Sequence, residues 1–519
     1  MIFRSPHPDV QIPRQSLTDF VLDPQRAQAS DPALVDGTTG RAVTYGELRE
    51  KVRRLAAGLA AIGIRKGDVV ALCSPNSPEF AIVFHAVLRL GAILTTMNPA
   101  NTAHELAHQL IDAGAKLLVS TAALADKARA AIDESQRAIE LITIDEAAGT
   151  RSLSSIALDA DPPTVTIDPE NDVAVLPYSS GTTGLPKGVM LTHRNLVANL
   201  LQTEAAERRD LRALVGVLPF FHIYGMVVIL NLGLMRGATI ITLPRFELEP
   251  FLQVLQDWPI ALAQIAPPIA VALAKHPVVD RYNLRHVETI FCAAAPLGEA
   301  LADAVKQRLG ITVKQGYGMT EASPVTHYTS YGCVQRGCSV GRLISLTEGR
   351  IVEVDSGRDA APGQPGEVWI RGPQVMKGYL NNPEATARTI DREGWLHTGD
   401  IGVVDADGYL TIVDRLKELI KVKGYQVAPA ELEALLLKHP RVADAAVIPV
   451  PDEECGEVPK AIIVPRGELT ADEVIAFVHS QVSHYKRIRH VAFVDAIPKS
   501  ASGKILRRVL VDRERALRS

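Results

Sequence analysis

The chain has 519 residues, of which 47% are hydrophobic and 22% are charged. This length exceeds what one ordinary core contains, so we expect two or more domains, and the composition argues against a disordered chain. The net charge of −4 argues against a protein that binds nucleic acid or a membrane through bulk positive charge.

The cysteines and the N-terminus bear on the compartment. The cysteines are scattered along the chain, at Cys73, Cys292, Cys333, Cys338 and Cys455. Because their number is odd and no matching Cys/His set accompanies them, we expect free thiols in a reducing compartment. The first residues contain no apolar run of signal-peptide length, and we expect a cytoplasmic protein.

Strand-like and helix-like segments alternate in the first part of the chain. Residues 45–63 and 80–92 have the apolar spacing of helices, the first of which ends at Gly63. Residues 67–75 and 115–123 have the apolar runs of buried strands. This alternation predicts an α/β protein whose sheets are largely parallel and covered by helices.

The segment PYSSGTTGLPKGV, residues 177–189, has the composition of a phosphate-binding loop. It is not a Walker A loop, because Gly188 rather than Ser or Thr follows Lys187 and the next residues are strand-like. We expect the next helix to begin with Thr192 as its N-cap. The segment is therefore predicted to be a turn between strands that binds a polyphosphate. The residues that supply hydroxyls, backbone N–H groups or charge are Ser179, Ser180, Gly181, Thr182, Thr183, Gly184 and Lys187.

The most apolar region, VVILNLGLM, follows Tyr224. Asn231 and Arg236 interrupt it well before the ~20 residues that a membrane span requires. We therefore expect a helix buried in the core.

The segment QGYGMTEASPV, residues 315–325, combines an aromatic ring with polar groups. Tyr317 could present its ring to a base, and Thr320 and Glu321 suit phosphate and Mg²⁺. The same residues could equally be an ordinary turn aromatic and an exposed acid.

The last quarter of the chain differs from the rest. Residues 363–414 have the short strands and turns of an antiparallel or barrel-like section, and helices and strands of a separate unit follow. Residues 415–519 hold 18 lysines and arginines against 14 acidic residues. A domain boundary after Asp414 is therefore expected, and the small basic domain either faces an anionic ligand or is merely solvated.

Two further segments carry polar groups suited to a nucleotide. In GWLHTGDIG, Asp400 lies in a glycine-flanked turn where it can accept two ribose hydroxyls, and Arg415 can reach the same sugar. Near the C-terminus, Lys504 follows Ser-Ala-Ser-Gly, a loop able to extend one ammonium into a site on another domain.

Seven segments in this order resemble one known superfamily. They are SSGTTGLPKGVMLTH, LPFFHIYG, QGYGMTEA, MKGYLNNPEATARTI, EGWLHTGDIG, VDRLKELIKVKGYQVAPAELEALLL and VDAIPKSASGKILR. They resemble the adenylate-forming superfamily of acyl-CoA synthetases, luciferases and peptide-synthetase adenylation domains, and most of all the 4-coumarate–CoA ligases. The likeness extends from about residue 30 to residue 510.

The resemblance implies a large AMP-binding domain, residues 1–414, and a small mobile α+β domain, residues 415–519. It implies two half-reactions: a carboxylate attacks ATP to give an acyl-adenylate and pyrophosphate, and the thiol of coenzyme A then displaces AMP. Lys504 would bridge the carboxylate and the α-phosphate, and Glu321 would hold Mg²⁺. The residues implied around the nucleotide, besides the loop of residues 179–187, are Gln315, Gly316, Tyr317, Thr320, Asp400, Arg415 and Gln426.

By the same resemblance, the small domain rotates about Lys417 between the two steps. This rotation would replace Lys504 by the Lys421–Gln426 segment, with Lys421 acting in the second step. The positions that match contacts to coenzyme A are Arg245, Lys423 and Gly424.

The resemblance also locates an acyl pocket. His222 is implied to gate the route of the thiol. The implied lining residues are Tyr224, Phe291, Ala294, Gly318, Pro324 and Val325. Alanines stand at positions 293 and 294, where glycines often occur, and Phe291 cannot hydrogen-bond a para-hydroxyl as the lysine of some members can. We therefore expect a slim cinnamate-type acid, since an added methyl or methoxy group typically costs ~1–3 kcal/mol in such a slot.

Other functions stay open at this point. A medium- or long-chain fatty acyl-CoA synthetase would use the same residues on a flexible tail. Loading of a carrier protein and luciferase-type oxygenation are disfavoured, because no carrier-like segment follows and nothing in the sequence indicates oxygen chemistry. A non-catalytic nucleotide-binding protein is disfavoured because Lys504, Glu321 and Asp400 are all present. We expect a monomer or homodimer that binds neither nucleic acid nor a membrane.

Overall fold

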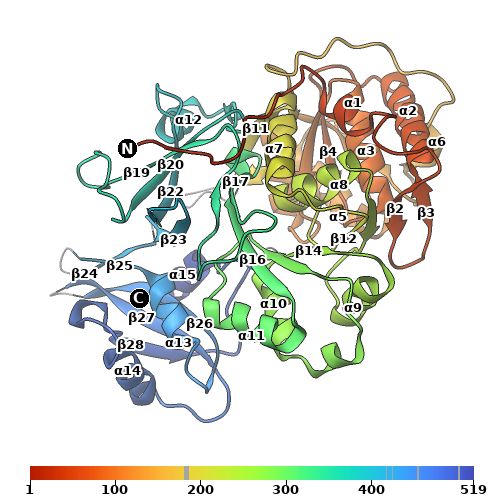
Figure 1. Cartoon of the computed structure of the whole chain (residues 1–519). Helices are drawn as coiled ribbons and strands as arrows, with labels where there is room; N and C mark the ends of the chain where they lie inside the picture. The colour runs from red at the N-terminus through yellow and green to blue at the C-terminus, as the bar shows by residue number, and fades with distance from the viewer. Residues whose placement is uncertain (180–185, 417, 423–424, 453–454, 501–502, 519) are drawn as a thin grey trace.

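The computed structural model describes residues 1–179, 186–416, 418–422, 425–452, 455–500 and 503–518. Figure 1 shows the red-to-green part of the chain on the right and below, with a teal sheet and the blue C-terminal part on the left. The structure is a mixed α/β fold, as the alternation of segments predicts.

The first sheet has a parallel centre formed by β5, β4, β6 and β7. Its strands, in spatial order, are β10 (Tyr178–Ser179), β11 (Lys187–Thr192), β9 (Val173–Val175), β5 (Ile93–Met97), β4 (Val69–Cys73), β6 (Ala115–Ser120), β7 (Glu140–Thr143) and β8 (Arg151–Ser152). At one edge, β21 (Gly378–Tyr379) pairs antiparallel with β11. The predicted strands at residues 67–75 and 115–123 are therefore confirmed.

Helices pack against this sheet or against the helices that cover it. They include α2 (Tyr45–Ala61), α3 (Pro78–Arg89), α4 (Ala103–Ala113), α5 (Ala125–Ser135) and α7 (His193–Ala206). Thr44 begins α2 with a reciprocal capping box, and Thr192 begins α7 in the same way, as predicted for that helix. The predicted end of the first helix is confirmed, since α2 stops just before Gly63, whose φ is 98°.

Two further sheets share the apolar core of the first sheet. One consists of β12 (Ala213–Gly216), β13 (Thr239–Thr242), β2 (Pro32–Asp36) and β3 (Ala42–Thr44). The other consists of β14 (Leu262–Ile265), β15 (Thr289–Cys292), β16 (Thr312–Gly318), β17 (Val325–Tyr328) and β18 (Arg342–Leu343). A fully buried π-helix, Tyr224–Asn231, continues into α8 (Leu232–Met235), which confirms the predicted core helix.

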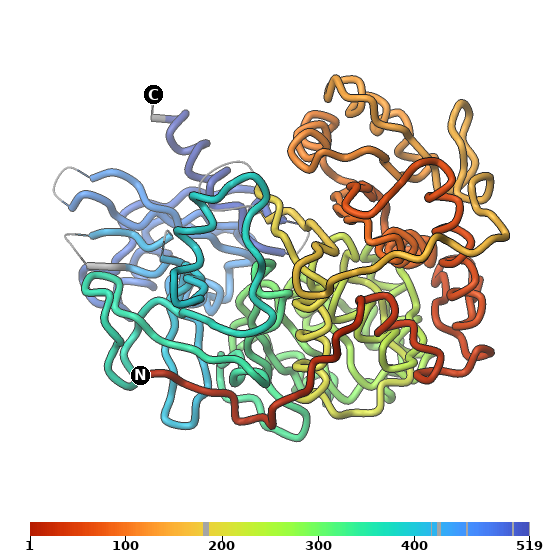
Figure 2. Tube along the Cα trace, turned by 90° about the horizontal axis from the view of Figure 1, so that it is seen from above, coloured from red at the N-terminus to blue at the C-terminus, as the bar shows by residue number. Residues whose placement is uncertain are grey.

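The predicted antiparallel section is also confirmed. It is a sheet of β1 (Phe3–Arg4), β19 (Glu348–Val352), β20 (Gly366–Arg371), β22 (Leu396–Val404) and β23 (Leu410–Arg415). β1 pairs with β19, so the N-terminal segment begins at this sheet; Figure 2 shows it running from there toward the rest of the molecule.

The C-terminal part has its own sheet and its own apolar core. The sheet consists of β25 (Tyr425–Val427), β24 (Ile420–Val422), β27 (Gly456–Pro465), β26 (Val442–Asp452) and β28 (His490–Phe493). Its helices are α13 (Pro429–Leu436), α14 (Ala471–His479) and α15 (Arg507–Arg518). Buried residues such as Val447 and Ile463 form a core distinct from the one in the preceding residues. The expected boundary after Asp414 falls within β23, and it stays a prediction.

Two smaller expectations concern cysteines and membrane spans. The five cysteines are free thiols within the described part of the chain, as predicted. Among the described residues, no helix combines the length and the apolar character that a bilayer crossing requires.

Candidate functional site

The site begins at the carboxyl end of β15, beside the last residues of β16. β16 continues past the end of β15, because Gln315 is the register partner of Cys292, the last residue of β15. The backbone there approaches its neighbours closely. A Cβ on Gly316 would lie 2.6 Å from Cζ of Phe291, and one on Gly318 would lie 2.2 Å from the carbonyl oxygen of Pro324. Glycine is therefore required at both positions.

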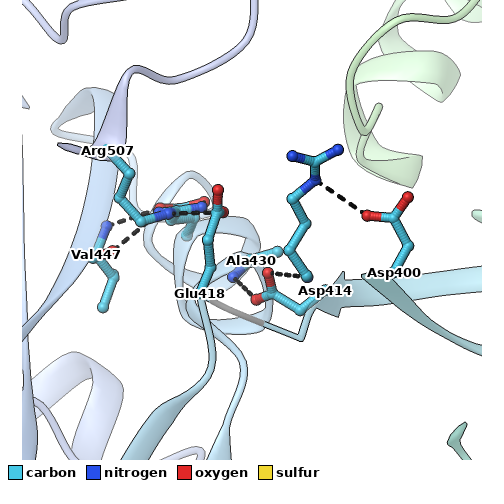
Figure 3. Close-up of polar contacts among 8 residues, drawn as sticks. Asp400, Asp414, Glu418, Ala430, Val447 and Arg507 are labelled. Atoms are coloured by element: carbon cyan, nitrogen blue, oxygen red, sulfur yellow. Dashed lines mark hydrogen bonds and ion pairs between the residues drawn. The ribbon is translucent and has the colours of Figure 1, made fainter. Parts of the chain in front are cut away.

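Three predicted ribose- and base-binding residues come together beyond this edge. Asp400 and Arg415 are register partners on β22 and β23. The Arg415 Nε–H donates to Oδ1 of Asp400 at 3.0 Å (Figure 3), and the Tyr317 hydroxyl donates to Oδ2. The carboxylate is buried and oriented by two donors, so it forms a preorganised acceptor for a diol.

The groups predicted to handle phosphate and Mg²⁺ meet at Tyr379. The Tyr379 hydroxyl donates to Oε1 of Glu321 at 2.9 Å, and Nζ of Lys187 lies 5.0 Å from the centre of the same ring. Glu321 is only 5% exposed, and Thr320 lies beside it on the same short turn. Tyr379 is not among the residues predicted from the sequence. It lies in the MKGYL motif, but its spacing gives no sign of a contact with Glu321.

Lys504 reaches this site from the C-terminal part of the chain. The loop that carries it packs against α10 (Pro267–Lys275), since a Cβ on Gly503 would lie 2.5 Å from Cδ of Pro268. Figure 1 shows the blue C-terminal part beside this helix. Burial and the charge of Arg415 lower the pKa of Lys504 to about 8, against the opposing charges of Glu418, Asp400 and Glu321.

His222 and Tyr224, both predicted to belong to the acyl pocket, lie near Lys504 and Phe291 respectively. Burial and the ammonium of Lys504 lower the pKa of His222 to about 4, so the ring is neutral at physiological pH. Its Nδ1 accepts the backbone N–H of Tyr224 at 3.3 Å, which leaves the ring proton on Nε2. The Tyr224 hydroxyl donates to the carbonyl oxygen of Phe291 at 3.3 Å.

The other residues predicted to line the pocket lie on or next to β15, β16 and β17. The Phe291 ring stacks on Tyr328 with the ring centres 4.2 Å apart. Pro324 and Val325 are buried beside Gly318, and Ala294 lies at the exposed rim with φ 75°. The structure therefore brings the pocket residues predicted from the sequence into one region.

Two known family models match the segments of the chain that contain most of these residues. A family model described as AMP-binding enzyme matches residues 23–380, and one described as AMP-binding enzyme C-terminal domain matches residues 431–504. The chain belongs to the AMP-binding enzyme family. The predicted family is thereby confirmed.

Individual relatives cover almost the whole of this AMP-binding enzyme. A 4-coumarate–CoA ligase of Vanilla planifolia is 44% identical over 98% of this chain and 96% of its own length. Among solved structures, ATP-bound MatB from Rhodopseudomonas palustris superposes with a TM-score of 0.90 at 28% identity, covering 97% of this chain and 100% of that one. The anthranilate CoA ligase AuaEII in complex with anthranoyl-AMP has a TM-score of 0.86 at 26% identity, with 97% and 98% covered.

Buried polar contacts connect the large and small parts of the AMP-binding enzyme. The Asp414 carboxylate accepts the backbone N–H groups of Arg415 at 2.6 Å and Ala430 at 2.9 Å, and Ala430 lies in the first turn of α13 (Figure 3). Burial raises the pKa of Asp414 to about 6, against these two N–H donors. Asp414 thereby joins the strand that carries Arg415 to the first helix of the C-terminal part.

Arg507 holds the segment that follows the Lys504 loop. Its Nε–H donates to Oε2 of Glu418 at 2.9 Å and its Nη1 donates to the carbonyl oxygen of Val447 at 2.9 Å, while Glu433 pairs with the same guanidinium (Figure 3). The start of α15 is therefore fixed to the core of the C-terminal part, and with it one end of the Lys504 loop.

Several predicted residues do not join this site. Lys421 is exposed on β24, where its backbone N–H donates to Glu457, and the side chain of Arg245 is 81% exposed beside Glu247. Figures 1 and 2 both place the β24–β25 hairpin at the edge of the molecule farthest from the first sheet. For Gln426 only the backbone, in β25, is described. The predicted site residues that lie outside the described residues are Ser180, Gly181, Thr182, Thr183, Gly184, Lys417, Lys423 and Gly424.

Proposed function

We propose that the protein is an ATP-dependent acid–CoA ligase for a slim aromatic acid of the 4-coumarate or cinnamate type. It is an enzyme of the acid–thiol ligase type to which its 4-coumarate–CoA ligase relatives belong. The observation that carries the proposal is the placement of Lys504, from the C-terminal loop, within electrostatic reach of Asp400 and Glu321. A cation between a ribose acceptor and a phosphate region is what carboxylate adenylation requires.

In the first half-reaction a carboxylate oxygen of the acid attacks the α-phosphorus of ATP and pyrophosphate leaves. Asp400, oriented by Tyr317 and Arg415, binds the ribose hydroxyls. The Nε2 group of Gln315 is buried and has no hydrogen-bond partner among the described residues, which leaves it available to the adenylate. The Lys504 ammonium neutralises charge shared by the carboxylate and the α-phosphate. Catalysis then comes mainly from alignment and charge neutralisation.

The outer phosphates occupy the region around Lys187 and the loop that precedes it. In the described part of the chain, the buried carboxylate of Glu321 lies at this region, where it contacts Tyr379 beside Lys187. One carboxylate together with substrate phosphates is how proteins commonly bind Mg²⁺, so the residues present fit this ion. When bound, Mg²⁺ would neutralise the charge of the departing pyrophosphate.

In the second half-reaction the thiol of coenzyme A attacks the acyl carbonyl and AMP leaves. We propose that residues 415–519 first rotate as a domain about Lys417, which withdraws Lys504 and brings the Lys421–Gln426 segment to the adenylate. Arg245, Lys423 and Gly424 would then contact coenzyme A. The exposed position of Lys421 and the inserted position of Lys504 fit the orientation required for the first step.

The aromatic wall of Tyr224, Phe291 and Tyr328 favours a flat ring over a flexible tail, which makes a fatty acyl-CoA synthetase the second candidate. The proposal includes a cytoplasmic protein, monomeric or homodimeric, without nucleic-acid or membrane partners. The free cysteines support a reducing compartment.

The test is pyrophosphate release by the purified protein with ATP, Mg²⁺ and single acids, with and without coenzyme A. The acids are 4-coumarate, caffeate, ferulate, sinapate, cinnamate, benzoate, octanoate and palmitate. We expect coumarate or cinnamate to be preferred and to yield the CoA thioester. Lys504→Ala should lose adenylation but still form thioester from a synthetic acyl-adenylate, and Lys421→Ala should show the reverse. Preference for octanoate or palmitate would contradict the acyl assignment, and release with no acid would contradict the ligase function.

A further inference from the structure

The strand that carries Asp400 bulges at this residue. β20 and β22 are antiparallel partners, but their register shifts between Glu367 and Trp369. Across this shift β20 has only Val368, whereas β22 has the whole of residues 398–400. A regular ladder of hydrogen bonds cannot continue over unequal numbers of residues, and bulges next to active sites commonly redirect a side chain. The direction of the Asp400 side chain therefore depends on what holds the bulge.

The side chain of Glu367 holds the bulge. Its Oε1 accepts the backbone N–H of Gly399 at 2.9 Å, and its Oε2 accepts the indole N–H of Trp369 at 2.8 Å. Gly399 has a φ of 71°, a left-handed conformation that glycine adopts without strain. The Trp369 ring is itself fixed, because it stacks on His397 with the ring centres 3.7 Å apart. The carboxylate therefore connects a fixed ring on β20 to the centre of the bulge on β22.

The bulge also contacts the segment that carries Arg415. The carbonyl oxygen of Gly399 accepts the backbone N–H of Leu416 at 2.8 Å, and the neighbouring Arg415 donates to the Asp400 carboxylate. Asp400 follows Gly399 directly in the chain, so a displacement of Gly399 also displaces the Asp400 carboxylate. Small displacements of a binding group from its productive geometry lower activity strongly. The position of the ribose acceptor is thus coupled to the hydrogen bond from Gly399 to Glu367.

We propose that Glu367 is a positioning residue, whose carboxylate fixes the bulge at Gly399 and thereby orients Asp400 toward the hydroxyls of the ATP ribose. This deepens the proposed function and rests on its assignment of Asp400. A carboxylate suits this role because both of its partners are N–H donors and it has an acceptor oxygen for each. A glutamine has one acceptor oxygen, and an alanine side chain has none. Glu367 acts through Gly399 rather than on the nucleotide itself.

The test compares ATP with its 2′,3′-dideoxy analogue, which lacks both hydroxyls that Asp400 would bind. Pyrophosphate release is measured with Mg²⁺ and the preferred acid. We expect kcat/KM of the unaltered enzyme to favour ATP by about hundredfold, the worth of two hydrogen bonds to a charged group. Glu367→Ala should reduce this preference to about tenfold or less. The loss should appear as a raised KM for ATP, with kcat and the use of the dideoxy analogue changed by less than about twofold.

Two further variants make the test specific. Glu367→Gln keeps an acceptor for one of the two donors and should lower the preference by an intermediate amount. It serves the same test if the alanine variant yields no active protein. Glu353→Gln is the matched control, because Glu353 is an exposed carboxylate just beyond β19 of the same sheet, where it accepts the Ser356 hydroxyl. This control should leave the preference unchanged. Each preference is a ratio within one preparation, so a fraction of unfolded enzyme cancels.

The outcomes separate this inference from the proposed function. If the Glu367 variants keep the hundredfold preference, even with both rates lowered together, Glu367 does not position Asp400, although the ligase function stands. If the unaltered enzyme uses both nucleotides equally well, Asp400 does not bind the ribose hydroxyls and the inference is wrong with that assignment. If no acid supports pyrophosphate release with either nucleotide, the proposed function is wrong and the inference fails with it.

Discussion

Ala294 is an alanine held in a conformation that favours glycine, and replacing it by glycine should stabilise the protein. Its φ is 75°, just beyond the end of β15. An alanine in the left-handed region costs roughly 1–2 kcal/mol relative to its usual conformations. Glycine avoids this cost but loses more backbone entropy on folding, by roughly 0.5–1 kcal/mol. Because Ala294 is exposed, its methyl contributes little packing, and Ala294→Gly should raise the free energy of unfolding by about 0.5–1 kcal/mol.

Urea unfolding followed by tryptophan fluorescence measures this change. The three tryptophans, Trp258, Trp369 and Trp395, all precede residue 415 and report on the large part of the chain. With a slope of about 3 kcal/mol per molar urea, the midpoint should rise by about 0.2–0.3 M. Ala293→Gly is the matched control, because Ala293 lies outside the left-handed region and is half-buried, so this variant should lose stability.

The same variant tests the acyl pocket. Removal of the Ala294 methyl should improve turnover of ferulate relative to 4-coumarate, because one methyl in a hydrophobic slot is worth about 1–3 kcal/mol of discrimination. If Ala294→Gly destabilises the protein as much as Ala293→Gly does, the strain argument is wrong. If the ferulate ratio does not change, Ala294 does not line the slot.

Charged groups of the site give three further predictions. Because the pKa of Lys504 is lowered to about 8, its ammonium is present below that pH and is lost above it; kcat/KM for adenylation should fall as pH rises through about 8, and pyrophosphate exchange by Lys504→Arg should lack this alkaline fall. Tyr379→Phe removes the hydroxyl that donates to Glu321, so the KM for the complex of ATP with Mg²⁺ should rise by roughly tenfold. Initial rates at varied concentrations of this complex measure the change, and an unchanged KM would show that Tyr379 does not act in the phosphate region. Arg507→Ala removes the ion-pair partner of the buried Glu433 and the half-buried Glu418 and should destabilise the C-terminal part by about 3 kcal/mol, seen as faster limited proteolysis there. Arg508→Ala, at a side chain 71% exposed, should behave as the unaltered protein.

The local structure of this protein could be predicted from short stretches of sequence. The strand at Val69–Cys73 follows from a run of apolar residues, and the start of α7 at Thr192 follows from a hydroxyl that caps its own helix. Both depend on interactions within a few residues, so the order of residues determines them. The motifs typical of the family are likewise contiguous, which is why the sequence alone identifies the family and predicts a nucleotide site that includes Asp400 and Lys504.

The contacts between distant segments were decided only by the tertiary structure. Tyr379 meets Glu321 across 58 positions of sequence, and no spacing rule connects the two. Asp400 and Arg415 are brought together by the pairing of β22 with β23. Phe291 and Tyr328 stack because β16 pairs with both of their strands. Packing and register join residues by distance in space rather than in sequence, so these parts of the site exist only in the folded chain.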